Sequence, residues 1–156
     1  MNVSFERTEQ KDEWLTPPEI FKPLQPFDLD VCQPLNPLWL IAPEGFTKLD
    51  DGLKQDWYGF VWCNPPYGGQ THRWLYRMGK HRNGIALIFA RTDTETFQDF
   101  VFSADAILFI KGRLSFYTIE GTRTNNAGAP SCLVAYGQEA IKRLEESGIK
   151  GKLVKL

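Results

Sequence analysis

Phe60-Val61-Trp62-Cys63-Asn64-Pro65-Pro66-Tyr67-Gly68 is the stretch that indicates how this 156-residue chain is organised. Its first four residues form an apolar run without alternation, which is typical of a strand covered on both faces of a sheet. The two prolines lack N–H groups, hold φ at about −65° and keep the residues before them extended, so the strand ends in a stiff turn. We expect this turn at the carboxyl end of a strand, where open α/β sheets bind ligands.

The turn offers two hydrogen-bond acceptors and a stacking face. The acceptors are the side-chain carbonyl of Asn64 and the backbone carbonyl of Pro65, and the stacking face is the ring of Tyr67. This combination suits a flat molecule with an exocyclic amino group. Two hydrogen bonds accepted from the amine would localise its lone pair and stabilise the positive charge that develops as the nitrogen attacks an electrophile. The competing interpretation is a plain Pro-rich turn with a capping Asn64 and a packed Tyr67.

Asn64-Pro65-Pro66-Tyr67 resembles the catalytic motif of amino-group methyltransferases that use S-adenosylmethionine. Other pieces resemble the small phage and prophage Dam-type DNA N6-adenine methyltransferases, and together they span roughly residues 12 to 136: Trp14-Leu15-Thr16-Pro17-Pro18-Glu19, Asp28-Leu29-Asp30-Val31, Asp50-Asp51-Gly52-Leu53, Ala90-Arg91-Thr92-Asp93 and Gly112-Arg113-Leu114. The resemblance implies S-adenosylmethionine as the cofactor, adenine in DNA as the substrate, and catalytic roles for Asn64, Pro65, Pro66 and Tyr67.

Candidate cofactor ligands precede the turn. Thr16 and Pro17 are expected to begin a short helix, with Thr16 as the cap and Pro17 at the first helical position. In the family, this segment resembles the one that receives the methionine carboxylate. Asp30 lies near the end of a predicted strand, where its carboxylate would meet the cofactor's ammonium group. Asn64 itself borders the cofactor in this interpretation.

A second acid is expected shortly before the catalytic strand. Similar methyltransferases carry a carboxylate there that accepts a hydrogen bond from the amino group of the cofactor's adenine. Asp51 fits best, Asp50 is the alternative, and Leu53 would pack on the adenine ring. A solvated Asp-Gly turn is the competing interpretation.

The turn after Asp30 departs from the general methyltransferase pattern, because Cys-Gln-Pro-Leu-Asn-Pro at 32–37 replaces the usual glycine-rich turn. One competing hypothesis is therefore a nucleic-acid-binding domain that kept the fold but lost cofactor affinity. Two further hypotheses retain the chemistry and change the substrate, to adenine in RNA or to a protein glutamine, because amides and aromatic amines both fit the motif.

The charge distribution limits how nucleic acid can be held. A formal net charge of −1 excludes binding by bulk electrostatics, so affinity has to come from a local basic strip. The candidates are Arg73, Arg77 and Lys80 on a predicted helix at 71–81, with Arg91 and Arg113 at strand ends on the edge that carries Asn64. A solvated helix face would explain the first three equally well.

Composition indicates one globular domain over residues 1–156, with a flexible segment at 1–11: hydrophobic residues make up 42% and charged residues 24%. Three cysteines without a C-x-x-C pair predict buried free thiols and no metal site. No apolar run reaches membrane-spanning length, and residues 1–13 are too polar for a signal peptide. We therefore expect a cytoplasmic protein of a bacterium or a phage-infected cell.

The pattern of elements predicts a single open α/β sheet, mostly parallel with one antiparallel strand, in a Rossmann-like methyltransferase architecture. Strands are expected at 27–31, 38–42, 60–63, 85–89, 106–110 and 132–136. Helices are expected at 71–81, around residues 97–101 with Asp93 or Thr94 as the cap, and at 138–147. Residues 115–128 are expected to form a hairpin arm, and 150–156 a basic tail.

Overall fold

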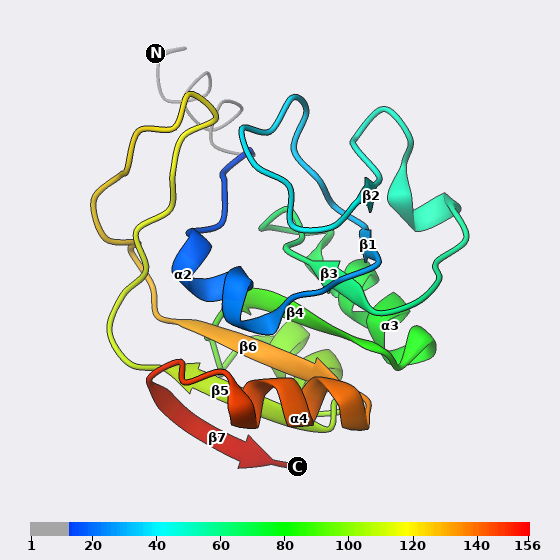
Figure 1. The fold of residues 1–156 in the computed structure, drawn as a ribbon. Helices are drawn as coiled ribbons and strands as arrows, with labels where there is room; N and C mark the ends of the chain where they lie inside the picture. The colour runs from blue at the N-terminus through cyan, green and yellow to red at the C-terminus, as the bar shows by residue number, and fades with distance from the viewer. Residues whose placement is uncertain (1–12) are drawn as a thin grey trace.

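The computed structural model describes residues 13–156, which form a seven-stranded sheet with helices on both faces (Figure 1). The predicted flexible segment at 1–11 lies outside the described residues. The strand order is β2-β1-β3-β4-β6-β5-β7. The strands are β1 (Leu29–Asp30), β2 (Glu44–Gly45), β3 (Val61–Cys63), β4 (Gly84–Phe89), β5 (Ala106–Ile110), β6 (Ser131–Tyr136) and β7 (Gly151–Lys155).

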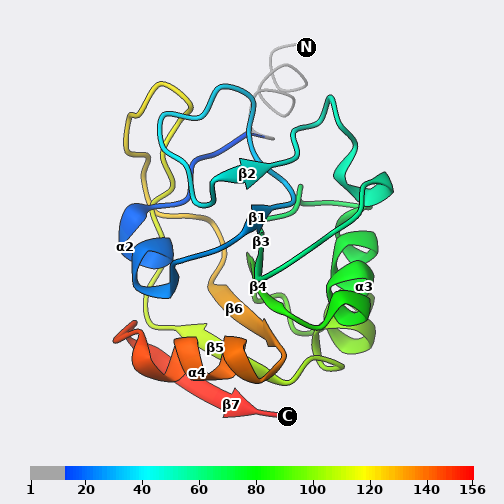
Figure 2. The ribbon, with the colours of Figure 1, turned by 45° about the vertical axis from the view of Figure 1, so that its right-hand side comes forward.

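Helices cover the sheet in two separate layers. One face carries α2 (Pro18–Phe21), the 3-10 turn η1 (Lys22–Leu24) and α4 (Gln138–Glu146), and the other carries α3 (Thr71–His81) and the π-helical turn η3 (Phe97–Val101). Figure 2 shows α2 and α4 on one side of the sheet and α3 on the other. A further 3-10 turn, η2 (Gly52–Lys54), contacts α3.

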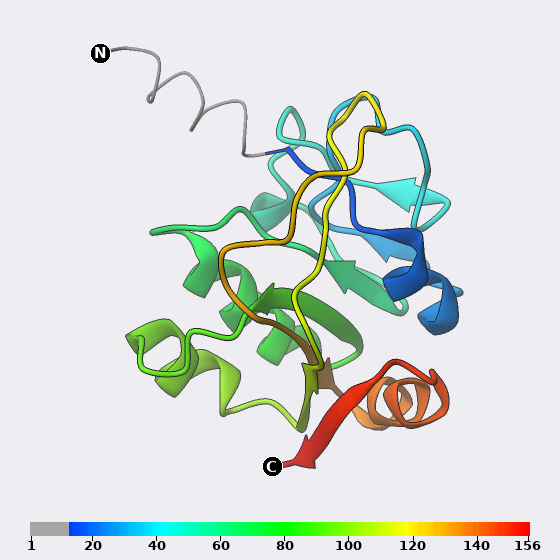
Figure 3. The same cartoon turned by 90° about the vertical axis from the view of Figure 1, so that its left-hand side faces the viewer.

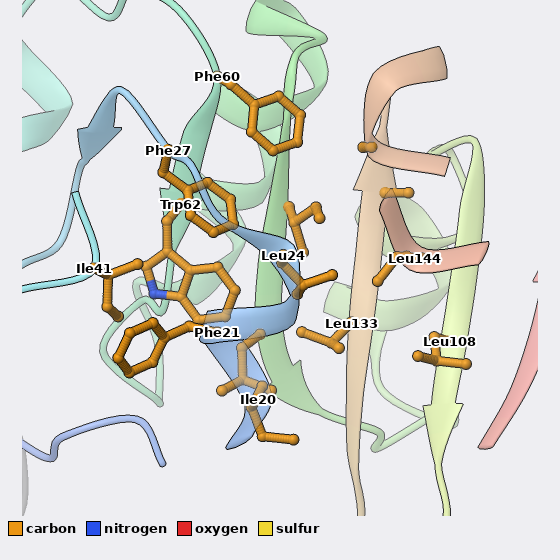
Figure 4. Packing of buried hydrophobic residues seen from close by; sticks show 14 of the residues in the cluster. Ile20, Phe21, Leu24, Phe27, Ile41, Phe60, Trp62, Leu108, Leu133 and Leu144 are labelled. Atoms are coloured by element: carbon orange, nitrogen blue, oxygen red, sulfur yellow. The ribbon is translucent and has the colours of Figure 1, made fainter. Parts of the chain in front are cut away.

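Two apolar clusters fill the spaces between these layers. Alternate residues of β6 divide between them: Leu133 and Ala135 face α2 and α4, whereas Cys132 and Val134 face α3. Figure 4 shows the first cluster, in which the fully buried Trp62 lies among Phe21, Phe27 and Ile41. Burial on both faces explains why the central strands are continuous apolar runs.

The sheet is mixed, which corrects the predicted arrangement. β2, β1, β3 and β4 run parallel to one another, but β6 and β7 both run antiparallel to the strands they pair with, where the sequence predicts one such strand. The additional strand is β7, which forms where the sequence predicts a basic tail. It pairs with β5 along five residues at the edge of the sheet. Lysines are common on edge strands because their charge opposes pairing with another chain. In sequence, such a lysine-rich strand is therefore hard to distinguish from a solvated basic tail.

The predicted strand at 38–42 is wrong. Leu38 and Leu40 point outward and are 58% and 54% exposed, and the short strand β2 forms two residues later. The other predicted positions agree within one or two residues, and α3 and β5 have the predicted bounds. Thr94 caps the helical turn around η3 by accepting a hydrogen bond from the N–H of Phe97 at 3.2 Å.

The predicted arm forms after β5 and lies against the start of the described chain (Figure 3). The N–H groups of Leu15 and Tyr117 each donate to the other residue's carbonyl oxygen, at 2.9 and 3.1 Å, and Tyr117 also bridges to Arg123. The arm therefore fixes the backbone of Leu15 and so positions Thr16, the next residue.

Candidate active site

The Asn64–Tyr67 turn lies at the carboxyl end of β3, as predicted, and is fixed from both sides. β3 precedes it within the sheet, with Cys63 fully buried. α3 follows it, and the Thr71 hydroxyl of that helix donates to the Pro66 carbonyl at 2.6 Å. Because Pro65 and Pro66 restrict the backbone between these anchors, the turn is held in one conformation.

The Asn64 amide is oriented by contacts at both of its ends. Its Nδ2 donates to the Thr16 hydroxyl oxygen at 3.3 Å, and its Oδ1 accepts from the Tyr67 hydroxyl at 3.2 Å. Thr16 is buried, so its hydroxyl is a fixed partner. The structure thus brings together Thr16, Asn64 and Tyr67, three of the residues selected from the sequence.

Thr16 is not a helix cap, which corrects the prediction for residues 16–17. Pro17 is the N-cap, with φ −61° and ψ 135°, no side-chain cap hydrogen bond forms, and Pro18 is the first helical residue. The reason is that Thr16 and Pro17 each precede a proline and are therefore driven to extended conformations. The Thr16 hydroxyl consequently faces Asn64.

The Tyr67 ring stacks on Phe89, a residue that the sequence did not single out. The ring centroids are 4.2 Å apart at an interplanar angle of 22°. Cys63 of β3 pairs with Ala86 of the parallel strand β4, so Phe89 extends three residues beyond the end of β3. That register places an aromatic ring level with the turn. An offset pair of this kind contributes about 0.5–1.5 kcal/mol, so Phe89 holds the Tyr67 ring in place.

Asp30 lies on the strand next to the turn, and it is a buried acid. Its position on β1 pairs with Trp62 of β3, two residues before Asn64, and its side chain is 3% exposed. Burial raises the pKa of the Asp30 carboxyl to about 7, although the Cys32 N–H that donates to its Oδ1 at 3.1 Å opposes this shift. A cationic group placed beside this carboxyl would restore its ionised form.

The second candidate acid lies on a separate loop. The Asp50 carboxylate accepts hydrogen bonds from the N–H and hydroxyl of Thr47 at 2.8 and 3.3 Å, which closes a local turn. Asp51 is exposed, has a φ of 54°, and approaches the Lys54 ammonium at 3.8 Å. These contacts leave Asp51 the better candidate ligand of the two. In the described chain, no hydrogen bond or ion pair joins Asp51 to the Asn64–Tyr67 turn.

Arg77 has a structural role. Its guanidinium donates to the Leu53 and Gln55 carbonyls at 2.7 and 2.6 Å and lies 4.7 Å from the centre of the Trp57 ring. It therefore fixes the loop containing η2 against α3. These contacts use donors that a DNA phosphate would need, so Arg77 is less suited to DNA binding than the sequence indicated.

The other predicted cations are exposed. Arg73 and Lys80 lie on the outer side of α3, and Arg91 and Arg113 follow β4 and β5. Because β4 and β5 both run in the direction of β3, Arg91 and Arg113 lie at the same edge of the sheet as Asn64, as predicted.

Ion pairing separates the arginines into two groups. Arg82, Arg123 and Arg143 have carboxylate partners at 3.1, 3.4 and 3.5 Å. Within residues 13–156, no carboxylate lies within 4.0 Å of the arginines that were selected as DNA ligands: Arg73, Arg77, Arg91 and Arg113. The cations near the turn are therefore not neutralised by carboxylates of the described chain.

Among the described residues, the hydrogen bonds of the Asn64 side chain go to Thr16 and Tyr67 and not to a cysteine thiol. Cys63 and Cys132 are buried free cysteines, as expected, and Cys32 is half-buried. Burial raises the pKa of the Cys132 thiol to about 12 and raises those of Cys32 and Cys63 as well. Among residues 13–156, no three His, Cys, Asp or Glu side chains group as metal ligands would. None of the helices over these residues is long and apolar enough to span a membrane.

Comparison with protein-family models gives a match over most of the chain. The family model described as DNA N-6-adenine-methyltransferase (Dam) matches residues 4–146. No curated protein and no solved structure gives a significant match. The matched region contains the turn, Thr16, Asp30 and the arginines at the sheet edge, and it extends over most of the sequence. The resemblance to the Dam-type family, which pieces across roughly residues 12 to 136 carry, is thereby confirmed, and the chain belongs to the Dam family of DNA N6-adenine methyltransferases.

Proposed function

We propose that this protein methylates the N6 amino group of adenine in DNA, with S-adenosylmethionine as the methyl donor. The observation that carries the proposal is the oriented Asn64 amide at the carboxyl end of β3, beside the Tyr67 ring, in a chain of the Dam family. The target adenine would leave the duplex to reach this turn, because base pairing otherwise engages its N6 group.

The residues of the turn would act on the amine directly. The Asn64 and Pro65 carbonyls would accept the two N6 hydrogens and make the nitrogen lone pair available for attack. As the new N–C bond forms, the same carbonyls would stabilise the positive charge on nitrogen until it loses a proton to solvent. The Tyr67 ring, supported by Phe89, would hold the base. When bound, the cofactor supplies a methyl group on a sulfonium, and the sulfur keeps the bonding electrons.

The residues fit an S-adenosylmethionine site at one point in particular. Ionising Asp30 in its buried position is costly, as its raised pKa shows, and an ammonium group such as that of the methionine moiety would offset this cost. Thr16 would offer its hydroxyl to the methionine carboxylate, and Asp51 would accept from the adenine amino group with Leu53 against the ring.

Labelled S-adenosylmethionine tests the proposal directly. Purified protein should transfer label to DNA, and nucleoside analysis should recover it as N6-methyladenine. Label in RNA or in protein glutamine, with none in DNA, would replace the proposed substrate. A protein that does not bind S-adenosylmethionine in a calorimetric titration would be a non-catalytic member of the fold.

Removing the Tyr67 hydroxyl should have little effect on catalysis, because the ring is what holds the base. We expect Tyr67→Phe to retain kcat within severalfold and to lower KM for DNA by up to about fivefold, since the Asn64 oxygen loses a competing hydrogen bond of about 1 kcal/mol. Tyr67→Ala should raise KM about tenfold or more through lost stacking. An equal loss of activity in Tyr67→Phe and Tyr67→Ala would assign the hydroxyl a direct role in the reaction.

The exposed arginines at the sheet edge should carry part of the salt dependence of DNA binding. Each phosphate contact contributes roughly 0.9 to the slope of log affinity against log salt on duplex DNA, so Arg91→Gln with Arg113→Gln should lower the slope by nearly two. S-adenosylmethionine affinity should be unchanged. The matched control is Lys142→Gln with Lys152→Gln, which removes the same charge from α4 and β7. An equal change in the control would place the DNA elsewhere.

A further inference from the structure

A shallow cleft of about 450 Å3 lies on the outer side of α3, and the mechanism above uses neither its aromatic side chains nor Arg73. It is enclosed by η2, α3 and the segment that contains η3. Its lining consists of Leu53, His72, Arg73, Tyr76, Arg77 and Phe100. Three of these six side chains are aromatic rings and two are guanidinium groups, a composition that suits a planar, negatively charged ligand.

The aromatic side chains form a supported stacking surface. Tyr76 is 55% exposed although it is large and apolar. Phe100 contacts Tyr76 edge-to-face, with ring centroids 6.4 Å apart, and lies 5.7 Å from the His72 ring. The Lys80 ammonium lies 5.3 Å from the centre of the Tyr76 ring. These contacts hold Tyr76 in place while leaving much of its surface open to a ligand.

The charge beside this surface is available. Arg73 is exposed, donates to the Gln70 side-chain oxygen at 3.1 Å, and has no carboxylate within 4.0 Å in the described part of the chain. Arg77 differs, because its guanidinium donates hydrogen bonds to the Leu53 and Gln55 carbonyls and is thereby fixed as one side of the cleft. Arg73 is therefore the group that would meet a phosphate, with Lys80 beyond Tyr76.

The cleft is connected to the catalytic turn through the first turn of α3. Thr71, the first residue of α3, is bonded to the carbonyl of Pro66 in the catalytic turn, and His72 and Arg73 follow it. Tyr76 is five residues along the helix, about 7.5 Å in axial rise. A DNA strand that delivers one nucleotide to Asn64 would place a neighbouring nucleotide within reach of Tyr76.

We propose that this cleft binds a nucleotide of the DNA strand that carries the target adenine, with the base stacked on Tyr76 and the phosphate beside Arg73. This inference rests on the proposed function. The adenine of S-adenosylmethionine shares the same stacking chemistry and is the competing source of a base, because Leu53 lines the cleft and is also a candidate contact for that adenine.

Two binding measurements distinguish the sources. The first is fluorescence anisotropy with a labelled 12-nucleotide single strand containing one adenine, and the second is calorimetric titration with S-adenosylmethionine. Tyr76→Ala should weaken binding of the oligonucleotide about tenfold, Tyr76→Phe should remain within twofold of wild type, and neither should alter cofactor affinity. Arg73→Gln should lower the salt slope by about 0.7, the single-strand value for one contact.

Tyr58→Ala is the matched control, because Tyr58 is another exposed tyrosine, 49% accessible, and lies outside the cleft. It should bind the oligonucleotide like wild type, and near-wild-type thermal melting should verify that each variant is folded. Unchanged oligonucleotide affinity in Tyr76→Ala would overturn the proposal, as would an equal loss of cofactor affinity, which would assign the cleft to the cofactor's adenine.

Methylation of duplex DNA by the wild-type protein, measured in parallel, separates this inference from the proposed function. If wild type forms N6-methyladenine while Tyr76→Ala binds the oligonucleotide normally, only the cleft assignment fails. If wild type binds the oligonucleotide but methylates no DNA, it is the proposed function that fails. If wild type does not bind the oligonucleotide, the cleft assignment is overturned whatever the activity.

Discussion

Asn64→Ala should lower kcat for DNA methylation by about 10²- to 10³-fold, the usual effect of removing one group that stabilises transition-state charge. The Asn64 carbonyl would accept one of the two N6 hydrogens, and this hydrogen bond strengthens as nitrogen becomes positive. The Thr16 contact at 3.3 Å fixes the orientation of the amide, so the acceptor is in place before the base arrives. Affinity for S-adenosylmethionine should change much less, because the lost contact is with the substrate.

Asn64→Asp is the matched variant for this prediction. It keeps an acceptor oxygen at the same position and replaces only the Nδ2 group that donates to Thr16. We therefore expect it to retain far more activity than Asn64→Ala. Single-turnover rates with saturating cofactor measure the chemical step in both variants. Near-wild-type turnover in Asn64→Ala would show that Asn64 does not act on the amine.

The central part of the fold could be predicted because its residues are buried on both sides. The apolar runs of β3, β4, β5 and β6 indicate strands whatever their partners are. β2 left no such signal, because a two-residue edge strand, Glu44–Gly45, buries little. The apolar run at 38–42, just before β2, therefore carries the strand prediction. In the structure this run is a loop, and Trp39 donates from its indole N–H to the Thr16 carbonyl at 3.1 Å.

The site was predictable in its residue types but not in its contacts. The turn specified Asn64 and Tyr67 through local backbone chemistry, whereas the Asn64–Thr16 hydrogen bond joins residues 48 positions apart. The same limit applies to Phe89, whose contact with Tyr67 depends on the register of β3 and β4. The sequence feature that could have identified Phe89 is a predicted strand, β4, that extends beyond the end of its neighbour β3 beside the catalytic turn. For Arg77, helical spacing predicts which face of the helix the side chain lies on, and this favours DNA binding. Spacing does not reveal the two loop carbonyls to which the guanidinium donates in the structure.

Asp30→Asn should weaken S-adenosylmethionine binding by about 1–3 kcal/mol, the value of a charge-assisted hydrogen bond, and should also remove a pH dependence. The pKa of the Asp30 carboxyl is raised to about 7, so the free protein carries it largely protonated below that pH. An ammonium group binds the ionised form. Wild-type affinity should therefore rise about tenfold between pH 6 and pH 8, with proton release on binding at the lower pH.

The unliganded protein should show the same ionisation in its stability. The folded-state pKa of Asp30 is raised above the unfolded value of about 3.9, so folding favours the protonated carboxyl. The stabilising contribution is full below about pH 4 and is lost as the pH rises through about 7. Denaturant titrations of wild type and Asp30→Asn over this range should therefore converge toward low pH and diverge toward neutral pH, with the wild type relatively less stable at pH 8.

Asp51→Asn provides the comparison that isolates the role of Asp30. If the Asp51 carboxylate accepts from the cofactor's adenine amino group, this variant should lose affinity as well, but it should keep the rise between pH 6 and pH 8 because Asp30 is intact. Calorimetric titrations of the three proteins at pH 6, 7 and 8 measure both effects. The Asn side chain does not ionise, so any pH dependence caused by Asp30 is lost in Asp30→Asn. The same pH profile in wild type and Asp30→Asn would therefore mean that the buried carboxyl does not meet the cofactor.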